Sequence, residues 1–412
     1  QSSPQSSPQS SSSLQSSSFV QLDPSLVALA YNYGRYLLAS SSRRSSRQPA
    51  NLQGVWADGL KAPWAGDFHL NINLEMAYWS AARANLVAST EPLATFVERL
   101  ALNGAKTARD WYGVEGGWVA HGFTDVHADG RALGENKWAL CVTCGAWIAL
   151  TSYEVTEVDP SNATRLERAL QVLDGAVRFF VDGYLLDYED PRDNNKTVKV
   201  TGPTTSPENG YRRRLPPLLP QQQQKNNATT FFGGIIQTKK NIKTQTTTRG
   251  STTTTRSSSS RKDTQRQPPR YEWGTLAASP AIDVAILTRL FEAYAEGCER
   301  LDRLRKSRRE SSEKNDDDGL VPQFSCDGAL VERALAVALP HGGRPAPCGD
   351  GTLREYPLGD FGDDDCAPDA GHRHFSGLWA LMPGRQISPL ASNNNETDEA
   401  RATLKKKIDA GG

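Results

Sequence analysis

Apolar residues recur at spacings of three and four positions along several segments of the chain, which is the pattern of amphipathic helices. It predicts helices near residues 25–40, 74–86, 91–112, 138–156, 164–186 and 281–304. Thr90, and Asp159–Pro160 with Ser161, are typical of helix starts. The alternation that indicates strands is rare, with Val198–Val200 as one weak candidate. Successive helices joined by Gly- and Pro-rich loops predict an all-α domain built from helical hairpins.

Polar tracts interrupt this pattern and predict the domain boundaries. A Ser/Gln-rich tract at 1–24, a low-complexity basic tract at 212–270 and a charged run at 305–318 are expected to be disordered or to form surface insertions. The helical domain is therefore expected in two parts, 25–211 and 271–412. Residues 221–270 hold ten Lys/Arg and one acid, a net charge of 10 − 1 = +9. RNA binding through this tract is the alternative to a solvated insertion.

The charge balance and the cysteines exclude several classes of protein. The 412 residues contain 47 Lys+Arg and 47 Asp+Glu, so the chain as a whole has no basic nucleic-acid footprint. No stretch approaches about 18 consecutive apolar residues, which predicts no membrane span. Six cysteines are too few for a disulfide scaffold. Cys141 and Cys144 are expected on one helix face as buried core residues, with redox or metal chemistry as the alternative.

The segment from His69 to Glu75 is the first candidate for chemistry. If it is extended, His69, Asn71 and Asn73 project from one face and three apolar residues project from the other. One imidazole and two amides side by side are suited to holding a water molecule or a sugar hydroxyl. The alternative is a half-buried strand with its polar side in solvent.

The second candidate is Thr204–Asn209. Here Ser206, Pro207 and Glu208 fit the N-cap and first turn of a helix. A helix N-terminus stabilises a charged carboxylate, whereas a general acid needs a carboxyl that stays protonated. Glu208 is therefore either a helix-start residue or a general acid.

The third candidate is Gly371–Gly377, which contains His372, Arg373 and His374. These side chains are expected to bind ligand hydroxyls. The alternative is a salt-bridged loop in which Arg373 and His374 pair with Asp363–Asp365 or Asp369. The chain has no Gly-rich phosphate loop, no H-E-x-x-H and no G-x-S-x-G. It therefore disfavours a nucleotide enzyme, a zincin and a serine hydrolase of the usual pattern.

Aromatic residues cluster in or near the loops, where they either stack on sugar rings or pack in the core. They are Trp56, Trp64, Tyr78, Trp79, Trp111, Tyr112, Trp118, Trp138 and Trp147.

Taken together and in order, these stretches resemble glycoside hydrolase family 95, the α-L-fucosidase family. The resemblance covers roughly 29–211 and 271–390. The matching stretches are Arg35–Ser42, Pro49–Trp56, His69–Met76, Gly117–His121, Thr201–Asn209 and Gly371–Ser376, the last running on to Met382–Gly384.

The resemblance implies an (α/α)6 barrel and the hydrolysis of terminal α-L-fucosyl linkages with inversion. It implies a fucosylated oligosaccharide or polysaccharide as substrate, with no metal, cofactor or nucleic acid. By motif match, Glu208 stands at the general acid, and Asn71 and Asn73 stand at the pair that orients the attacking water. His69, Arg373 and His374 match substrate-pocket residues.

The family's base carboxylate lies in a His-Pro-Pro-Phe-Gln-Ile-Asp-Gly-Asn-like motif beyond the His-Arg-His loop, and this chain has no such motif. We therefore expect a partial catalytic domain that is inactive or nearly so as written and that binds fucose weakly. A carbohydrate-binding protein without catalysis is the alternative. Asp67, Glu75 and Asp125 are the only substitutes for the base that we consider. N-glycosylation triplets, for example at Asn162, are compatible with secretion.

Overall fold

The computed structural model describes residues 23–190, 194–214, 271–311, 324–358, 366, 369–390 and 395–412. Nearly all of the Ser/Gln-rich tract, the bulk of the 212–270 tract and the end of the charged run lie outside these residues. The start of the charged run, 305–311, is helical instead of forming an irregular insertion. The described residues belong to two compact units.

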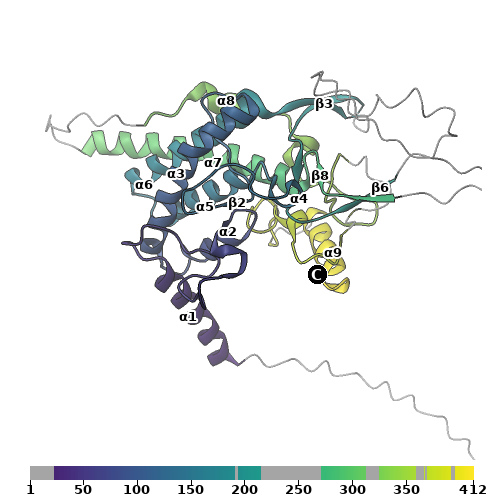
Figure 1. Cartoon of the computed structure of the whole chain (residues 1–412). Coiled ribbons are helices and arrows are strands. Elements are labelled where there is room, and N and C mark those ends of the chain that lie inside the picture. Colours follow the sequence, from purple (N-terminus) through teal and green to yellow (C-terminus); the bar gives the residue numbers. More distant parts are fainter. Residues whose placement is uncertain are drawn as a thin grey trace, which may run out of the picture. The chain divides into compact units, whose positions relative to one another are not determined.

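The first unit comprises the chain up to Asp187 and then Ile286–Ala338, and it is mainly helical (Figure 1). In this unit β1 pairs with β2 antiparallel, Phe68 opposite Thr124. Helices α3, α5 and α6 pack against one another, and α2 packs on α5. Its elements are α1 (Pro24–Ser41), η1 (Pro63–Gly66), β1 (Phe68–His69), α2 (Asn73–Trp79), η2 (Val87–Thr90), α3 (Glu91–Tyr112), β2 (Phe123–Thr124), α4 (Asn136–Ala139), α5 (Cys144–Val158), α6 (Ala163–Phe179), the π-helical turn η3 (Phe180–Tyr184), α7 (Ala281–Ser311) from Ile286 onward, and α8 (Gly328–Leu335).

An extended segment at 117–121 runs between α3, α5 and α6 and bonds to a glycine on each helix. The carbonyl oxygens of Gly104 on α3 and Gly175 on α6 accept backbone hydrogen bonds from the segment at 3.3 and 3.1 Å. The N–H of Gly145 on α5 donates one at 3.0 Å. A Cβ at any of these glycines would lie 2.5–2.8 Å from the segment. The helices can therefore approach the segment this closely only with glycine at these positions.

The second unit comprises Tyr188–Ala285 and Leu339–Gly412. Short strands pair as β3 with β4, β5 with β8 and β6 with β7. Two small apolar clusters, one of them formed by Tyr211, Ala277 and Tyr356, lie among its described residues. Its elements are β3 (Leu186–Asp190) from Tyr188 onward, β4 (Lys196–Val200), β5 (Thr204–Thr205), β6 (Tyr211–Arg214), β7 (Tyr271–Gly274), β8 (Leu276–Ala277), η4 (Pro340–Gly343), η5 (Ser376–Leu378) and α9 (Asn395–Asp409).

Most of the helices expected from the sequence are present, with differences at their ends. The expected 74–86 helix ends at Trp79, and the expected 138–156 helix is two helices separated by Leu140–Thr143. The cap of α6 is Asn162, not Ser161, because the Asn162 side chain accepts from the Arg165 N–H at 3.0 Å. The weak strand candidate Val198–Val200 lies in β4.

The cysteines form disulfides, whereas no disulfide scaffold is expected from the sequence. All six are joined in disulfides, Cys141–Cys144, Cys298–Cys326 and Cys348–Cys366. Cys141 and Cys144 are buried as expected, but they do not share a helix face, because Cys144 is the first residue of α5 and Cys141 lies before it.

One helical segment, Asn136–Val158, is long and apolar enough by composition to cross a membrane, whereas no membrane span is expected from the sequence. In this structure 83% of its apolar window is buried inside the protein, which is also how the core helix of a folded domain behaves.

The Cys298–Cys326 disulfide closes a loop with a sequence separation of 28 residues, whereas Cys141–Cys144 closes one of 3. A crosslink stabilises mainly by restricting the unfolded chain, and more so for longer loops. Replacing both Cys298 and Cys326 with Ala should lower the free energy of unfolding by about 3 kcal/mol. Cys141→Ala with Cys144→Ala is the matched control and should cost clearly less. Urea unfolding measures both, and equal losses would contradict the loop-entropy account.

Candidate functional site

Glu208 lies in a tight turn that follows β5. The N–H of Asn209 donates to the carbonyl oxygen of Ser206 at 2.8 Å. Glu208 has a φ of 61°, in the left-handed region that few non-glycine residues adopt. No helix begins at this motif, so the interpretation of Ser206 as a helix cap is wrong. The turn leaves the Glu208 side chain 15% exposed.

A buried carboxylate, Glu355, holds this turn in place. Its Oε1 accepts hydrogen bonds from the hydroxyls of Ser206 and Ser376, the second at 2.7 Å. The Asn209 amide donates to Ser376 Oγ, and Tyr356 Oη donates to the Asn209 carbonyl at 3.1 Å. Both ends of the Glu208 turn are therefore bonded to side chains from distant parts of the chain.

The His-Arg-His loop supplies two cationic or polar groups to Glu208. Arg373 Nη2 forms an ion pair with Glu208 Oε2, and His374 Nε2 lies 3.7 Å from the same oxygen. The described residues do not show the expected ion pairs of Arg373 and His374 with nearby aspartates. Asp369 instead accepts from the Gly210 N–H at 3.3 Å, and Asp363–Asp365 lie outside the described residues.

The environment of His374 fixes the role of each of its ring nitrogens. Nδ1 lies 3.0 Å from the Pro207 carbonyl oxygen, which can only accept, so Nδ1 carries the proton. Burial lowers the pKa of His374, and Glu208 opposes that shift. In the neutral ring, Nε2 is therefore a hydrogen-bond acceptor directed toward the Glu208 carboxyl. The backbone of this loop is also held, because the buried Lys407 donates to the His374 carbonyl at 3.1 Å.

The segment with His69, Asn71 and Asn73, in the first unit, is not extended as expected. β1 ends at His69, and Asn73 is the first residue of α2. Asn71 is buried with 1% exposure, whereas Asn73 is exposed. The structure therefore does not place the three side chains on one face of a strand.

His69 is held by its surroundings. Its Nε2 lies 2.9 Å from Asp67 Oδ1, and its ring packs on Phe123 with centroids 4.5 Å apart. Burial raises the pKa of Asp67, and His69 counteracts part of that rise.

Two of the considered substitutes for a base have structural roles. Glu75 is fully buried, and neither of its carboxyl oxygens has a hydrogen-bond partner among the described residues. Burial holds the pKa of Glu75 well above its usual value, so the side chain is a neutral acid inside the core. Asp125 accepts from the His127 N–H at 2.9 Å and organises its own turn.

His121, in the stretch bonded to the three glycines, is also buried. Burial lowers its pKa to about 4, and its Nε2 lies 3.0 Å from Tyr112 Oη. It is therefore a neutral core residue at physiological pH.

The aromatic residues divide into two groups. Trp118 and Trp147 are buried, and Trp118 donates from its indole to the Val172 carbonyl at 2.8 Å. Trp56, Trp64, Trp111 and Trp138 are exposed, at 44%, 74%, 50% and 39%. These exposed rings have surface available for stacking on a sugar.

Among the described residues, one group of three potential metal ligands lies within reach of a single ion: Cys348, Asp350 and Cys366. The two sulfurs are bonded to each other as a disulfide. A disulfide offers no thiolate, so this group does not fit a metal centre.

Sequence comparison decides the family of the chain. The pattern of the glycosyl hydrolase family 95 catalytic domain matches residues 1–239 and 226–412, which together cover the whole chain. The chain belongs to glycosyl hydrolase family 95. The mainly helical first unit agrees with the (α/α)6 barrel of that family and confirms the expected fold class.

Curated relatives of this family 95 chain are fucosidases by name. Alpha-L-fucosidase 2 of Arabidopsis thaliana is 40% identical over 190 residues, 46% of this chain and 22% of that protein. The probable alpha-fucosidase A of Aspergillus niger is 34% identical over 189 residues, 46% of this chain and 23% of that protein. The probable alpha-fucosidase A of Aspergillus oryzae is 45% identical over 100 residues, 24% of this chain and 14% of that protein. The matched part thus spans less than a quarter of each relative.

The sequence did not identify the residues that support the Glu208 turn. Glu355 bonds to Ser206 across 149 sequence positions, and nothing in its local sequence marks it. Ser206 and Ser376 lie inside two of the matching stretches, but their support of the turn, like that of Tyr356, comes from contacts that only the folded chain creates.

Replacing the buried Glu75 with Met should stabilise the family 95 chain more at pH 7 than at pH 4. The folded pKa lies above the unfolded value near 4.5, so the unfolded chain loses this proton first and the wild type loses stability as the pH rises. At pH 4 the carboxyl is mostly protonated in both states, so the pH-dependent part of the stabilisation should be small. Thermal unfolding of both proteins at the two pH values measures this. A difference that does not change with pH would contradict a neutral buried Glu75.

Replacing Glu355 with Ala should lower the free energy of unfolding by about 1–3 kcal/mol, because two buried hydroxyls lose their acceptor. Glu355→Gln is the matched control, because its amide oxygen still accepts, and it should cost less. Urea unfolding compares the two. An equal loss in both variants would mean that the negative charge of Glu355, and not its acceptor role, supports the turn.

Proposed function

We propose that this family 95 chain is α-L-fucosidase-like and acts in the hydrolysis of terminal α-L-fucosyl linkages with inversion. The substrate is a fucosylated oligosaccharide or polysaccharide. The observation that carries the proposal is the Glu208 carboxyl, partly exposed on a fixed turn with Arg373 and His374 at one of its oxygens. The fucosidase names of the relatives support the same reaction class.

Glu208 is the proposed general acid. A glycosidic oxygen leaves as a hydroxyl only if it receives a proton as the bond breaks. A carboxyl on a loose loop would spend little time in position, whereas the bonds from Ser206 and Asn209 hold this one at a fixed place. The neutral His374 Nε2 is an acceptor that a sugar hydroxyl can use.

Arg373 and His374 are proposed to bind sugar hydroxyls, and His69 of the first unit is proposed as a further substrate-binding residue on the strength of its motif. The Arg373 side chain is 70% exposed, so it can leave Glu208 and donate to a bound sugar without unfolding its surroundings. His69 is more restricted, because Asp67 already holds its Nε2.

Asn71 and Asn73 are proposed to orient the attacking water. Amides can position a water molecule but cannot take its proton, so an inverting reaction also needs a carboxylate base. We assign this base to none of the three candidates. Glu75 is fully buried, Asp67 is paired with His69, and Asp125 organises a turn.

An extracellular location accompanies this proposal. The three disulfides of the structure persist in oxidising compartments, and secreted proteins are exposed to free glycans there.

Glu208→Gln should reduce hydrolysis of a 2′-fucosylated oligosaccharide by roughly 10²–10⁴-fold in any form of the protein that hydrolyses it. An aryl fucoside with a very good leaving group should lose much less, because it needs little protonation. Glu396→Gln is the control, since that carboxylate pairs with Arg344 on the surface, and it should keep full activity. Initial rates on both substrates measure the effect.

Equal losses on the two substrates would remove Glu208 from the acid role. Fucose binding without turnover in every form of the protein would contradict catalysis and favour a carbohydrate-binding function.

A further inference from the structure

Four arginines gather around an open groove on the first unit. The groove has a volume of about 450 Å³ and lies beside the first turns of α3. Its lining residues are Arg44, Ser46, Arg47, Glu91, Pro92, Thr95, Arg99 and Arg168. Four cationic side chains thus meet one carboxylate in this lining.

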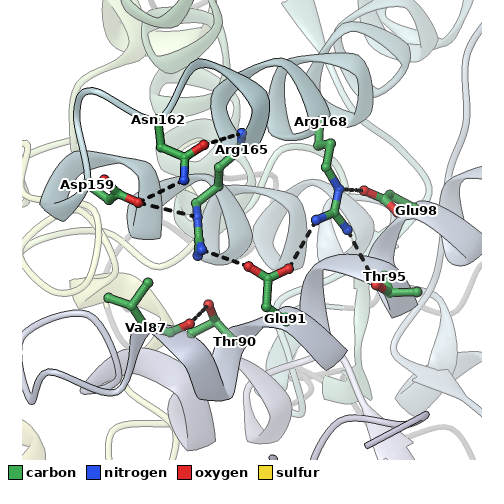
Figure 2. Close-up of polar contacts among 9 residues, drawn as sticks. All are labelled: Val87, Thr90, Glu91, Thr95, Glu98, Asp159, Asn162, Arg165 and Arg168. Atoms are coloured by element: carbon green, nitrogen blue, oxygen red, sulfur yellow. Dashed lines mark hydrogen bonds and ion pairs between the residues drawn. The ribbon is translucent and has the colours of Figure 1, made fainter. Parts of the chain in front are cut away.

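That one carboxylate is already neutralised. Figure 2 shows the Glu91 carboxylate between two arginines, with Arg165 Nη2 at 2.7 Å from one oxygen and Arg168 Nη1 at 3.1 Å from the other. Arg168 also donates through Nε to Glu98 at 2.6 Å. Both oxygens of Glu91 are therefore occupied, and the carboxylate has little charge left to offer the other arginines of the groove.

The other three arginines lack a carboxylate partner. Among the described residues, Arg44 and Arg47 form no ion pair, and both are exposed. Arg99 donates only to neutral acceptors, the Gln48 side chain at 2.9 Å and the Arg47 carbonyl at 3.4 Å. Its Nε is buried without a hydrogen-bond partner. Among the described residues, these three guanidinium groups thus have no carboxylate partner of their own.

Arginines arranged in this way suit an anion with several oxygens. The guanidinium is always charged, and its planar fork of N–H groups matches the oxygens of sulfate, phosphate or carboxylate. The N-terminal turn of α3 adds a partial positive charge to the same groove. A volume of about 450 Å³ falls within the ~300–1,000 Å³ of pockets that hold whole organic ligands, and so exceeds the needs of one ion.

We propose that this groove binds the sulfate esters of an anionic polysaccharide through Arg44, Arg47 and Arg99. The sulfate oxygens accept hydrogen bonds from the guanidinium groups, and the open groove lets the polymer chain continue past the site. The binding needs neither Glu208 nor hydrolysis, so it stands independently of the proposed fucosidase reaction.

The test compares the binding of dextran sulfate to the full chain and to Arg44→Gln with Arg47→Gln, at low ionic strength. The control is Arg109→Gln with Arg131→Gln, which removes the same charge from exposed arginines of the same unit that already pair with Asp110 and Asp129. The basic 221–270 tract is present in every variant and contributes equally. The groove variant should bind at least about tenfold more weakly than the wild type, because it loses charge-assisted hydrogen bonds, and the control should bind almost normally.

Unsulfated dextran should not bind, and added salt should weaken the binding of dextran sulfate. Equal weakening in the groove variant and the control would overturn the proposal, because it would indicate general charge attraction. Binding of inorganic sulfate without dextran sulfate would also overturn it and leave only a small-ion site. Circular dichroism melting of each variant verifies that loss of binding is not loss of fold.

Discussion

The buried carboxylate of Glu355 is the interaction on which the candidate site depends. A buried charge is stable only when hydrogen bonds replace the water that it has lost, and here two serine hydroxyls supply them. One serine precedes the Glu208 turn and the other follows the His-Arg-His loop. Satisfying Glu355 therefore brings these two segments together. The same carboxylate excludes a side chain at Gly377, where a Cβ would lie 2.5 Å from Glu355 Oε2.

In the mainly helical first unit, steric crowding at three glycines determines how closely the helices approach one another. The extended segment at 117–121 bonds to glycines on three helices, and any larger residue there would push a helix away. This explains why part of the family motif lies in the core: Trp118 and His121 are buried packing residues. A motif that identifies a family thus contains residues that build the fold beside residues that are available for chemistry.

The sequence predicted those features that depend on local periodicity. The helices α1 and α3 lie close to where the apolar spacing placed them, and the family motifs led to Glu208, Arg373 and His374, which do lie together. Features that depend on distant contacts could not be predicted. The break at Leu140–Thr143 and the turn at Asn71 interrupt patterns that continue in the sequence, because the disulfide and the neighbouring strands override local preference. Glu355 and the groove arginines carry no local signal, since their roles arise only after folding.

The central claim is that the turn presents the Glu208 carboxyl to the oxygen of the bond that breaks. An experimental structure of the protein with an unhydrolysed fucoside tests this most directly. The account predicts a Glu208 carboxyl oxygen at about 2.6–3.2 Å from the glycosidic oxygen, with Arg373 moved from Glu208 to a sugar hydroxyl. A bound fucoside whose glycosidic oxygen contacts a different acid, while Arg373 stays paired with Glu208, would contradict it.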